Sequence, residues 1–177
     1  MTTSDRMVSM STVEPMPRRR LDRADLAAVV VAWAGVGLGL VAKLAFAGWV
    51  LVVIFVFFLL TIVLPLVGAY VVQRALLGTG QRRISDRTRP WYRAFGWATG
   101  TGVFLAYACV VDGGDVEGDE HSLLMFLSGG SATPDWVQAA VFPVWAVGVG
   151  AAAAAIVLYL VERTRARRAV RAAGGAV

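Results

Sequence analysis

The fold is decided by residues 26–72, which read LAAVVVAWAGVGLGLVAKLAFAGWVLVVIFVFFLLTIVLPLVGAYVV. These 47 residues contain a single charge, that of Lys43. As one straight helix they would measure about 70 Å, more than twice the roughly 30 Å thickness of the hydrocarbon core of a bilayer. The stretch must therefore fold back on itself. The turn is expected at residues 45–49, where Lys43 can reach the headgroups, Gly48 relaxes the backbone and Trp49 suits the membrane interface.

Two later apolar stretches complete the pattern. The sequence predicts an all-α integral membrane bundle of four helices in two consecutive hairpins, with spans at about residues 26–46, 49–72, 94–111 and 137–161. Pro65 removes a backbone hydrogen bond and should kink the second span. The segments between and around the spans are a flexible basic tail at 1–25, a basic loop at 73–93 anchored by Trp91 and Tyr92, an acidic loop at 112–136 and a basic tail at 162–177.

The arginines give the orientation of this bundle. All 16 fall in the two tails and the 73–93 loop, and none falls in the short turn or the acidic loop. Because loops rich in Lys and Arg stay in the cytoplasm, both termini should lie inside, in a multi-pass protein of the cytoplasmic membrane. The residues that carry most of this signal, and that should face anionic lipid headgroups, are Arg18, Arg19, Arg20, Arg82, Arg83, Arg167 and Arg168.

A cleaved signal peptide is the alternative for the first span, because Ala45-Phe46-Ala47 resembles a small-x-small cleavage site. Against cleavage, the apolar run is longer than usual, Lys43 interrupts it just before the site, and another span follows at once. Cleavage would leave three spans in the same orientation.

Composition narrows the class of protein. Hydrophobic residues make up 58% of the chain and charged residues 16%, whereas soluble proteins average about 25% charged residues. The net charge of +5 does not indicate nucleic-acid binding, because the basic clusters adjoin membrane spans. The use of 16 Arg and one Lys is typical of a GC-rich bacterial genome. A single cysteine, Cys109, excludes an intramolecular disulfide.

Small residues at four-residue spacing predict which helices pack together. Helices in lipid associate where small side chains let their backbones approach. We therefore expect the first, third and fourth spans to pack together, while the second, rich in Phe and Val, exposes a large face to lipid. A homo-oligomer is the alternative use of the same motifs, which are Gly35 with Gly39, Gly96 with Gly100, and Ala146 with Gly150.

Two isolated charges should meet at the outer boundary of the membrane. Lys43 ends the first span and Asp112 ends the third, and these spans are expected to be neighbours. The sequence therefore predicts an ion pair between them that fixes the register of the two helices.

The acidic loop is the most distinctive polar cluster. Oxygen ligands with interspersed glycines suit Ca²⁺, and a histidine could add a nitrogen for a softer metal. The spacing does not fit an EF-hand, so a solvated loop is the simpler interpretation. The weak metal candidates are Asp112, Asp115, Glu117, Asp119, Glu120 and His121.

No sequence motif indicates catalysis or a cofactor. His121 is the only histidine, which excludes a paired-histidine zinc site, and no span carries a central ionisable residue of the kind that a proton-coupled transporter needs. The leading hypothesis is a non-enzymatic accessory or interaction protein that presents arginines to anionic lipid or to a protein partner. The alternatives are a small transport or channel subunit acting as an oligomer, and an outer-face sensor of divalent cations.

Overall fold

The computed structural model describes residues 22–46, 48–78, 85–113, 120–130 and 133–174, and in these ranges the chain is almost entirely helical. A two-residue antiparallel pair, β1 with β2, closes the base of the acidic loop. The elements are α1 (Arg23–Ala45), α2 (Trp49–Val56), the π-helix η1 (Leu59–Val63), α3 (Leu64–Leu77), α4 (Arg89–Cys109), β1 (Asp112–Gly113), β2 (Glu120–His121), α5 (Leu123–Leu127) and α6 (Asp135–Gly174).

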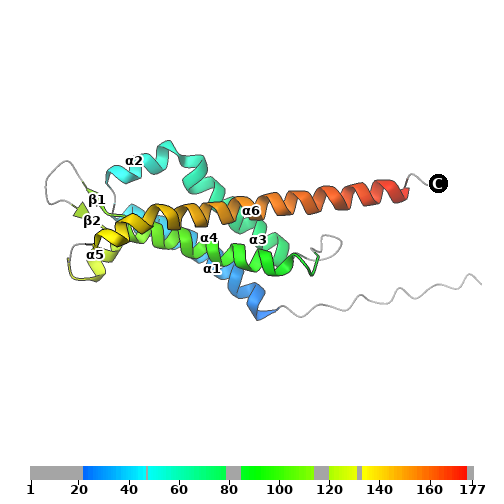
Figure 1. The fold of residues 1–177 in the computed structure, drawn as a ribbon, viewed down its shortest axis with the longest axis horizontal. Coiled ribbons are helices and arrows are strands. Elements are labelled where there is room, and N and C mark those ends of the chain that lie inside the picture. The colour runs from blue at the N-terminus through cyan, green and yellow to red at the C-terminus, as the bar shows by residue number, and fades with distance from the viewer. Residues whose placement is uncertain (1–21, 47, 79–84, 114–119, 131–132, 175–177) are drawn as a thin grey trace, which may run out of the picture.

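Three helical segments are long and apolar enough to cross a membrane. They are α1, the joined η1 and α3, and residues 135–172 of α6. Helices α1, α3, α4 and α6 form an elongated bundle, and α2 and η1 arch away from its side (Figure 1). Large apolar side chains cover the outside of this bundle, among them Phe55, Phe58 and Leu59. An apolar exterior of this kind is compatible with a membrane protein.

Glycines bring α1 and α4 into backbone contact. A Cβ atom added at Gly35 would overlap the carbonyl of Gly100, and one added at Gly100 would overlap the carbonyl of Val31. Gly39 and Gly96 lie in the same contact. The four glycines singled out in these two helices therefore sit where α1 and α4 approach most closely.

The corresponding contact of α6 lies two residues away from the predicted one. Ala146 and Gly150 are exposed, and nothing lies within 4 Å of a Cβ atom added at Gly150. Instead, a Cβ at Gly102 of α4 would come within 2.8 Å of the Gly148 Cα. The prediction for α6 was therefore wrong, because this helix turns its Gly148 face, and not its Gly150 face, towards α4.

The second span is broken, not merely kinked. α2 ends at Val56, η1 widens the helix by one residue per turn, and α3 then runs on to Leu77, five residues past the predicted end. Pro65 has no N–H, so the carbonyl of Thr61 lacks its usual helical donor, and the Tyr107 hydroxyl of α4 donates to it at 2.8 Å. The Thr61 hydroxyl in turn lies 2.8 Å from the carbonyl of Ile54, which the end of α2 leaves without a helical partner.

The helices of the third and fourth predicted spans, α4 and α6, extend beyond their predicted limits. α4 begins at Arg89, five residues early, because Pro90 suits the first turn of a helix. α6 extends for 40 residues to Gly174, so most of the predicted C-terminal tail belongs to the last helix. Ala and Arg dominate residues 163–173, and both are strong helix formers.

The acidic-loop end of the bundle is closed by short elements. The Gln138 amide donates to the Cys109 carbonyl at 3.0 Å, which satisfies a free carbonyl at the end of α4. Ser122 caps α5 by accepting a hydrogen bond from the Met125 N–H at 3.1 Å. The apolar residues 123–127 thus form a helix, and its Phe126 contacts Phe46 with ring centroids 5.7 Å apart.

Candidate functional site

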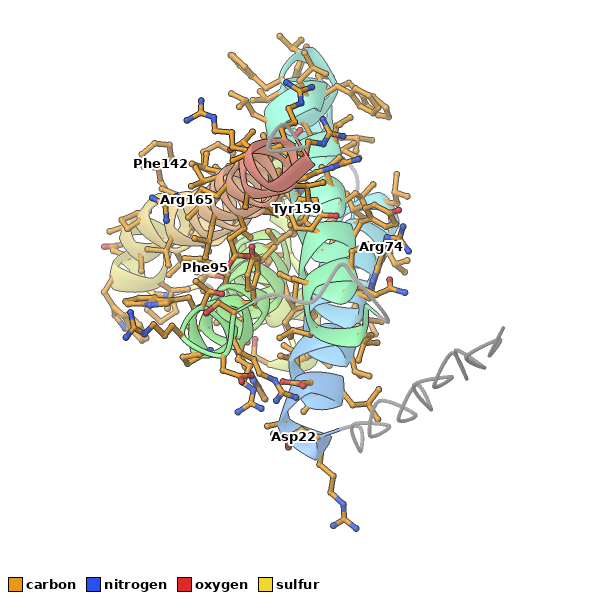
Figure 2. All side chains as sticks on the ribbon, turned by 90° about the vertical axis from the view of Figure 1, so that its right-hand side faces the viewer. Asp22, Arg74, Phe95, Phe142, Tyr159 and Arg165 are labelled. Atoms are coloured by element: carbon orange, nitrogen blue, oxygen red, sulfur yellow. The ribbon has the colours of Figure 1, made fainter. Side chains whose placement is uncertain are left out.

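The opposite end, which we call the arginine end, is formed by the start of α1, the end of α3, the start of α4 and the last part of α6. Figure 2 looks onto this end, where Asp22 precedes α1, Arg74 lies in the last turn of α3 and Arg165 lies in α6. The arginines of α4 and α6 differ in their surroundings. Those of α4 are bound to carboxylates of α1, whereas those of α6 project beyond the bundle.

Asp25 is the centre of the bound group. Its side chain is only 1% exposed and accepts hydrogen bonds from Arg89 and from Arg93, whose Nε lies 2.7 Å from Oδ1. Arg93 also pairs with Asp22, the N-cap of α1. The Ala24 N–H, and then Arg93, lower the pKa of Asp22 and so keep this carboxylate charged. The ion pairs fasten the start of α1 to the start of α4.

Glu162 fastens α6 to α4 in the same way. Its carboxylate accepts a hydrogen bond from the Thr88 hydroxyl at 2.6 Å and from the Tyr92 hydroxyl at 3.0 Å. Burial, followed by the neighbouring charge of Glu162, raises the pKa of Tyr92. Tyr92 was expected to anchor a loop in the membrane interface, and that prediction was wrong, because its ring is fully buried in the cluster of Val29, Val72 and Ala155.

Beyond Glu162, α6 carries an unneutralised arginine face. Arg163, Arg167 and Arg171 follow one another at four-residue spacing, so they line one side of the helix, and Arg168 lies beside them. All four are exposed. Within the ranges that the structure describes, no carboxylate forms an ion pair with them. Arg165 projects from another side of the helix (Figure 2).

At the acidic-loop end the predicted ion pair between Lys43 and Asp112 is present. Lys43 Nζ lies 2.7 Å from Asp112 Oδ2, and both side chains are buried. The two atoms are in charge contact without the alignment of a hydrogen bond. The other carboxylate oxygen accepts the Val50 N–H at 2.8 Å, so one aspartate ties together α1, α2 and the end of α4.

The metal candidates do not assemble in the part of the chain that the structure describes. Asp112 is already engaged by Lys43 and Val50. Asp115, Glu117 and Asp119 lie outside the described residues, as do Arg18, Arg19, Arg20, Arg82 and Arg83. Among the described side chains, no three of His, Cys, Asp and Glu lie close enough together to hold a metal ion.

Sequence reasoning missed the acids at the arginine end. Asp25 and Glu162 each border an apolar run, where a charge normally faces water, so the apolar pattern by itself gives them no partner. A usable signal was present. Asp22 and Asp25 are three apart and Arg89 and Arg93 are four apart, which puts each pair on one side of its helix.

The chain was compared with protein-family models, with curated proteins and with solved structures, and no match was found in any of the three. The function must therefore be argued from the chain itself.

Proposed function

We propose that the chain crosses the membrane four times, with both termini and the 73–93 loop in the cytoplasm. Three spans follow from length and hydropathy, and α4 supplies the fourth because it packs between α1 and α6 along the same axis. The distribution of arginine supports the orientation, since every arginine lies in one of the two tails or in the 73–93 loop.

We propose further that the protein acts by interaction and not by catalysis, and that its arginine face binds an acidic surface of a partner protein. One observation carries this proposal: α6 continues as a single helix beyond Glu162, where its last contacts with the bundle are made, and displays four exposed arginines there. A helix presented in this way offers a preformed row of positive charges, so little conformational entropy is lost on binding.

The position of these arginines favours a protein over the lipid headgroups. From Glu162 to Arg171 the helix rises by about 14 Å. Electrostatic attraction in physiological salt is screened over about 8 Å. Because α6 keeps the direction of its membrane span, Arg167, Arg168 and Arg171 extend away from the headgroup layer, towards proteins on that side of the membrane.

An oligomeric channel gains less support. Gly35, Gly39, Gly96 and Gly100 are covered by contacts within the chain, so they are not available to join two copies. A cation sensor is also less well supported, because the Asp112 carboxylate is already paired with Lys43.

Photo-crosslinking from position 170 in native membranes tests the proposal. Val170 is 73% exposed and adjoins the arginine face, so a photoreactive residue there should give an adduct of one discrete mass. Replacing Arg163, Arg167 and Arg171 together by glutamine should abolish this adduct, and raising the salt concentration should weaken it. A probe at the exposed Trp136, at the start of α6, serves as the matched control.

Two outcomes would refute the proposal. One is an adduct to lipid alone, which would assign the arginines to the headgroups. The other is a protein adduct that survives the triple substitution undiminished, which would show that the partner recognises something other than the arginine face.

A further inference from the structure

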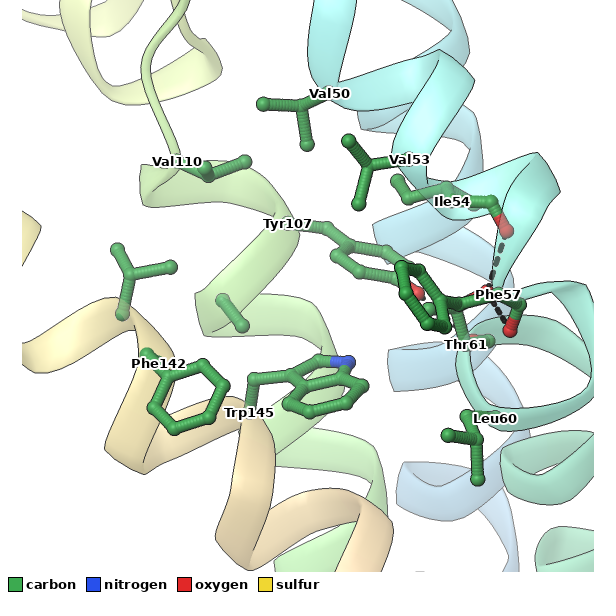
Figure 3. A pocket seen from close by; sticks show the side chains of 12 residues that line it. Val50, Val53, Ile54, Phe57, Leu60, Thr61, Tyr107, Val110, Phe142 and Trp145 are labelled. Atoms are coloured by element: carbon green, nitrogen blue, oxygen red, sulfur yellow. Dashed lines mark hydrogen bonds between the residues drawn. The ribbon is translucent and has the colours of Figure 1, made fainter.

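A cavity of about 480 Å³ lies between the arch of the second span and the pair α4 and α6. Its wall is almost wholly aromatic and aliphatic (Figure 3). The residues that shape it are Ile54, Phe57, Tyr107, Val110, Phe142 and Trp145. This volume falls within the range of about 300–1,000 Å³ that is usual for sites that bind small molecules.

The two hydroxyl groups in the wall are already used. Thr61 donates to the carbonyls at the end of α2, and Tyr107 donates to the Thr61 carbonyl. Both hydroxyl protons are therefore already donated within the protein, and the rest of the wall is almost wholly apolar. An apolar cavity of this kind also does not hold water. The apolar wall is therefore suited to bind a hydrocarbon chain.

The length of the cavity suits one leaflet of the bilayer. It extends along the second span from Val50, beside the Lys43–Asp112 pair, to Leu60. Ten residues of helix measure at most about 15 Å, so the cavity fits within half of the roughly 30 Å hydrocarbon core. The outer side of the arch is itself covered by exposed apolar residues, Phe55, Val56 and Leu59, so hydrocarbon surrounds the arch on that side too.

The fold keeps this space open by specific bonds. The break at Phe57, the π-turn and Pro65 turn α2 away from the bundle, and the Tyr107–Thr61 hydrogen bond fixes α4 to the point where the chain returns. The backbone geometry thus holds the groove open. Within a membrane, the groove lies beside the hydrocarbon chains of the lipids.

We propose that this groove binds one hydrocarbon chain of a lipid from the leaflet on the acidic-loop side, with the polar head of the lipid near Trp49 and Asp112. The inference is independent of the partner proposed for the arginine face, since it concerns the other end of the molecule.

Fluorescence of Trp145 tests the inference, because this side chain lies in the wall of the groove. The full-length protein in detergent micelles would be titrated with phosphatidylcholine brominated along its chains, which quenches nearby tryptophan. The contribution of Trp145 is the difference between the wild type and Trp145→Phe. Trp97, which is exposed on α4 and does not line the groove, gives the reference in the same way through Trp97→Phe.

Trp145 should be quenched at lower lipid fractions than Trp97. Val141→Phe, which fills the groove, should abolish this difference, whereas Val147→Phe on the exposed side of α6 should preserve it. Circular dichroism would show that both variants are folded. Equal quenching of both tryptophans would overturn the inference, and so would a groove occupied by a second copy, detected as a dimer whose Trp145 is shielded from the brominated lipid.

Discussion

Buried charges hold the two ends of the bundle in register. Asp25 binds two arginines at one end, and Lys43 binds Asp112 at the other. A charge removed from water is costly unless it is paired, so removing one partner of such a pair is strongly destabilising. Because the pairs lie at opposite ends of α1, they also allow only one sliding position of α1 against α4.

Reversing the charge of Lys43 or Asp112 should show this directly. Lys43→Asp should lower the free energy of unfolding by about 3–5 kcal/mol, as is typical when one partner of a buried pair is lost. The combination with Asp112→Lys should restore part of the loss, since attraction returns while the Val50 N–H still lacks its acceptor. Thermal unfolding in detergent would measure all three variants, with the exposed Asp135→Asn as control. If the double variant loses as much free energy of unfolding as the two single variants lose together, the pairing is contradicted.

Tyr92 should make stability sensitive to alkaline pH. Its pKa in the folded protein is raised, whereas an unfolded tyrosine titrates near pH 10, so the folded state binds this proton more tightly. The contribution of Tyr92 is therefore complete below about pH 10 and declines as the pH rises further. Unfolding measured at about pH 9 and pH 11 should reveal a steeper decline for the wild type than for Tyr92→Phe. Equal declines would show that Tyr92 is not the group responsible.

At the scale of single elements, glycine positions distinguish buried from lipid-facing sides of helices. Gly100→Ala should destabilise the protein by about 1–3 kcal/mol or more, because the added methyl group meets the Val31 backbone, which cannot move aside. Gly150→Ala should be neutral or stabilising by up to about 1 kcal/mol, because its site is open and alanine favours the helix. Melting temperatures of the two variants, compared with that of the wild type, would test both expectations. If both lose stability equally, the α1–α4 contact is not as close as the structure places it.

The sequence predicts features that have a distinct signal in composition or spacing. Helical segments follow from apolar runs, the α1–α4 glycines from their four-residue spacing, and the Lys43–Asp112 pair from two isolated charges that each end an apolar span. Features without such a signal are missed. The break in the second span is one such feature, because the Thr61 carbonyl that Pro65 leaves without a helical donor is satisfied by the hydroxyl of Tyr107, 46 positions from Thr61. The side of α6 that is buried was likewise missed, since Gly148 and Gly150 are equally small and only the shape of α4 selects between them.

At the scale of the whole molecule, the two ends have different chemistry. One end gathers arginines, some bound to acids within the bundle and others displayed on α6. The other end gathers acids and closes the bundle with the β1–β2 pair and α5 (Figure 1). We predict that a membrane holds two such ends in a defined direction, because Lys and Arg close to the spans set their orientation whereas Asp and Glu contribute little.

Cysteine accessibility in intact cells tests that direction. In a Cys109→Ser background, single cysteines would replace Ser85 between α3 and α4, Leu127 in α5 and Ala172 near the end of α6, all of which are exposed. A membrane-impermeant thiol reagent should label only position 127, and opening the cells should make positions 85 and 172 reactive too. Labelling of 85 and 172 but not 127 in intact cells would reverse the orientation and place the arginine face outside. If 85 and 172 differ from each other, the number of crossings between them is odd, so α4 and α6 cannot be two spans that alone lie between these positions.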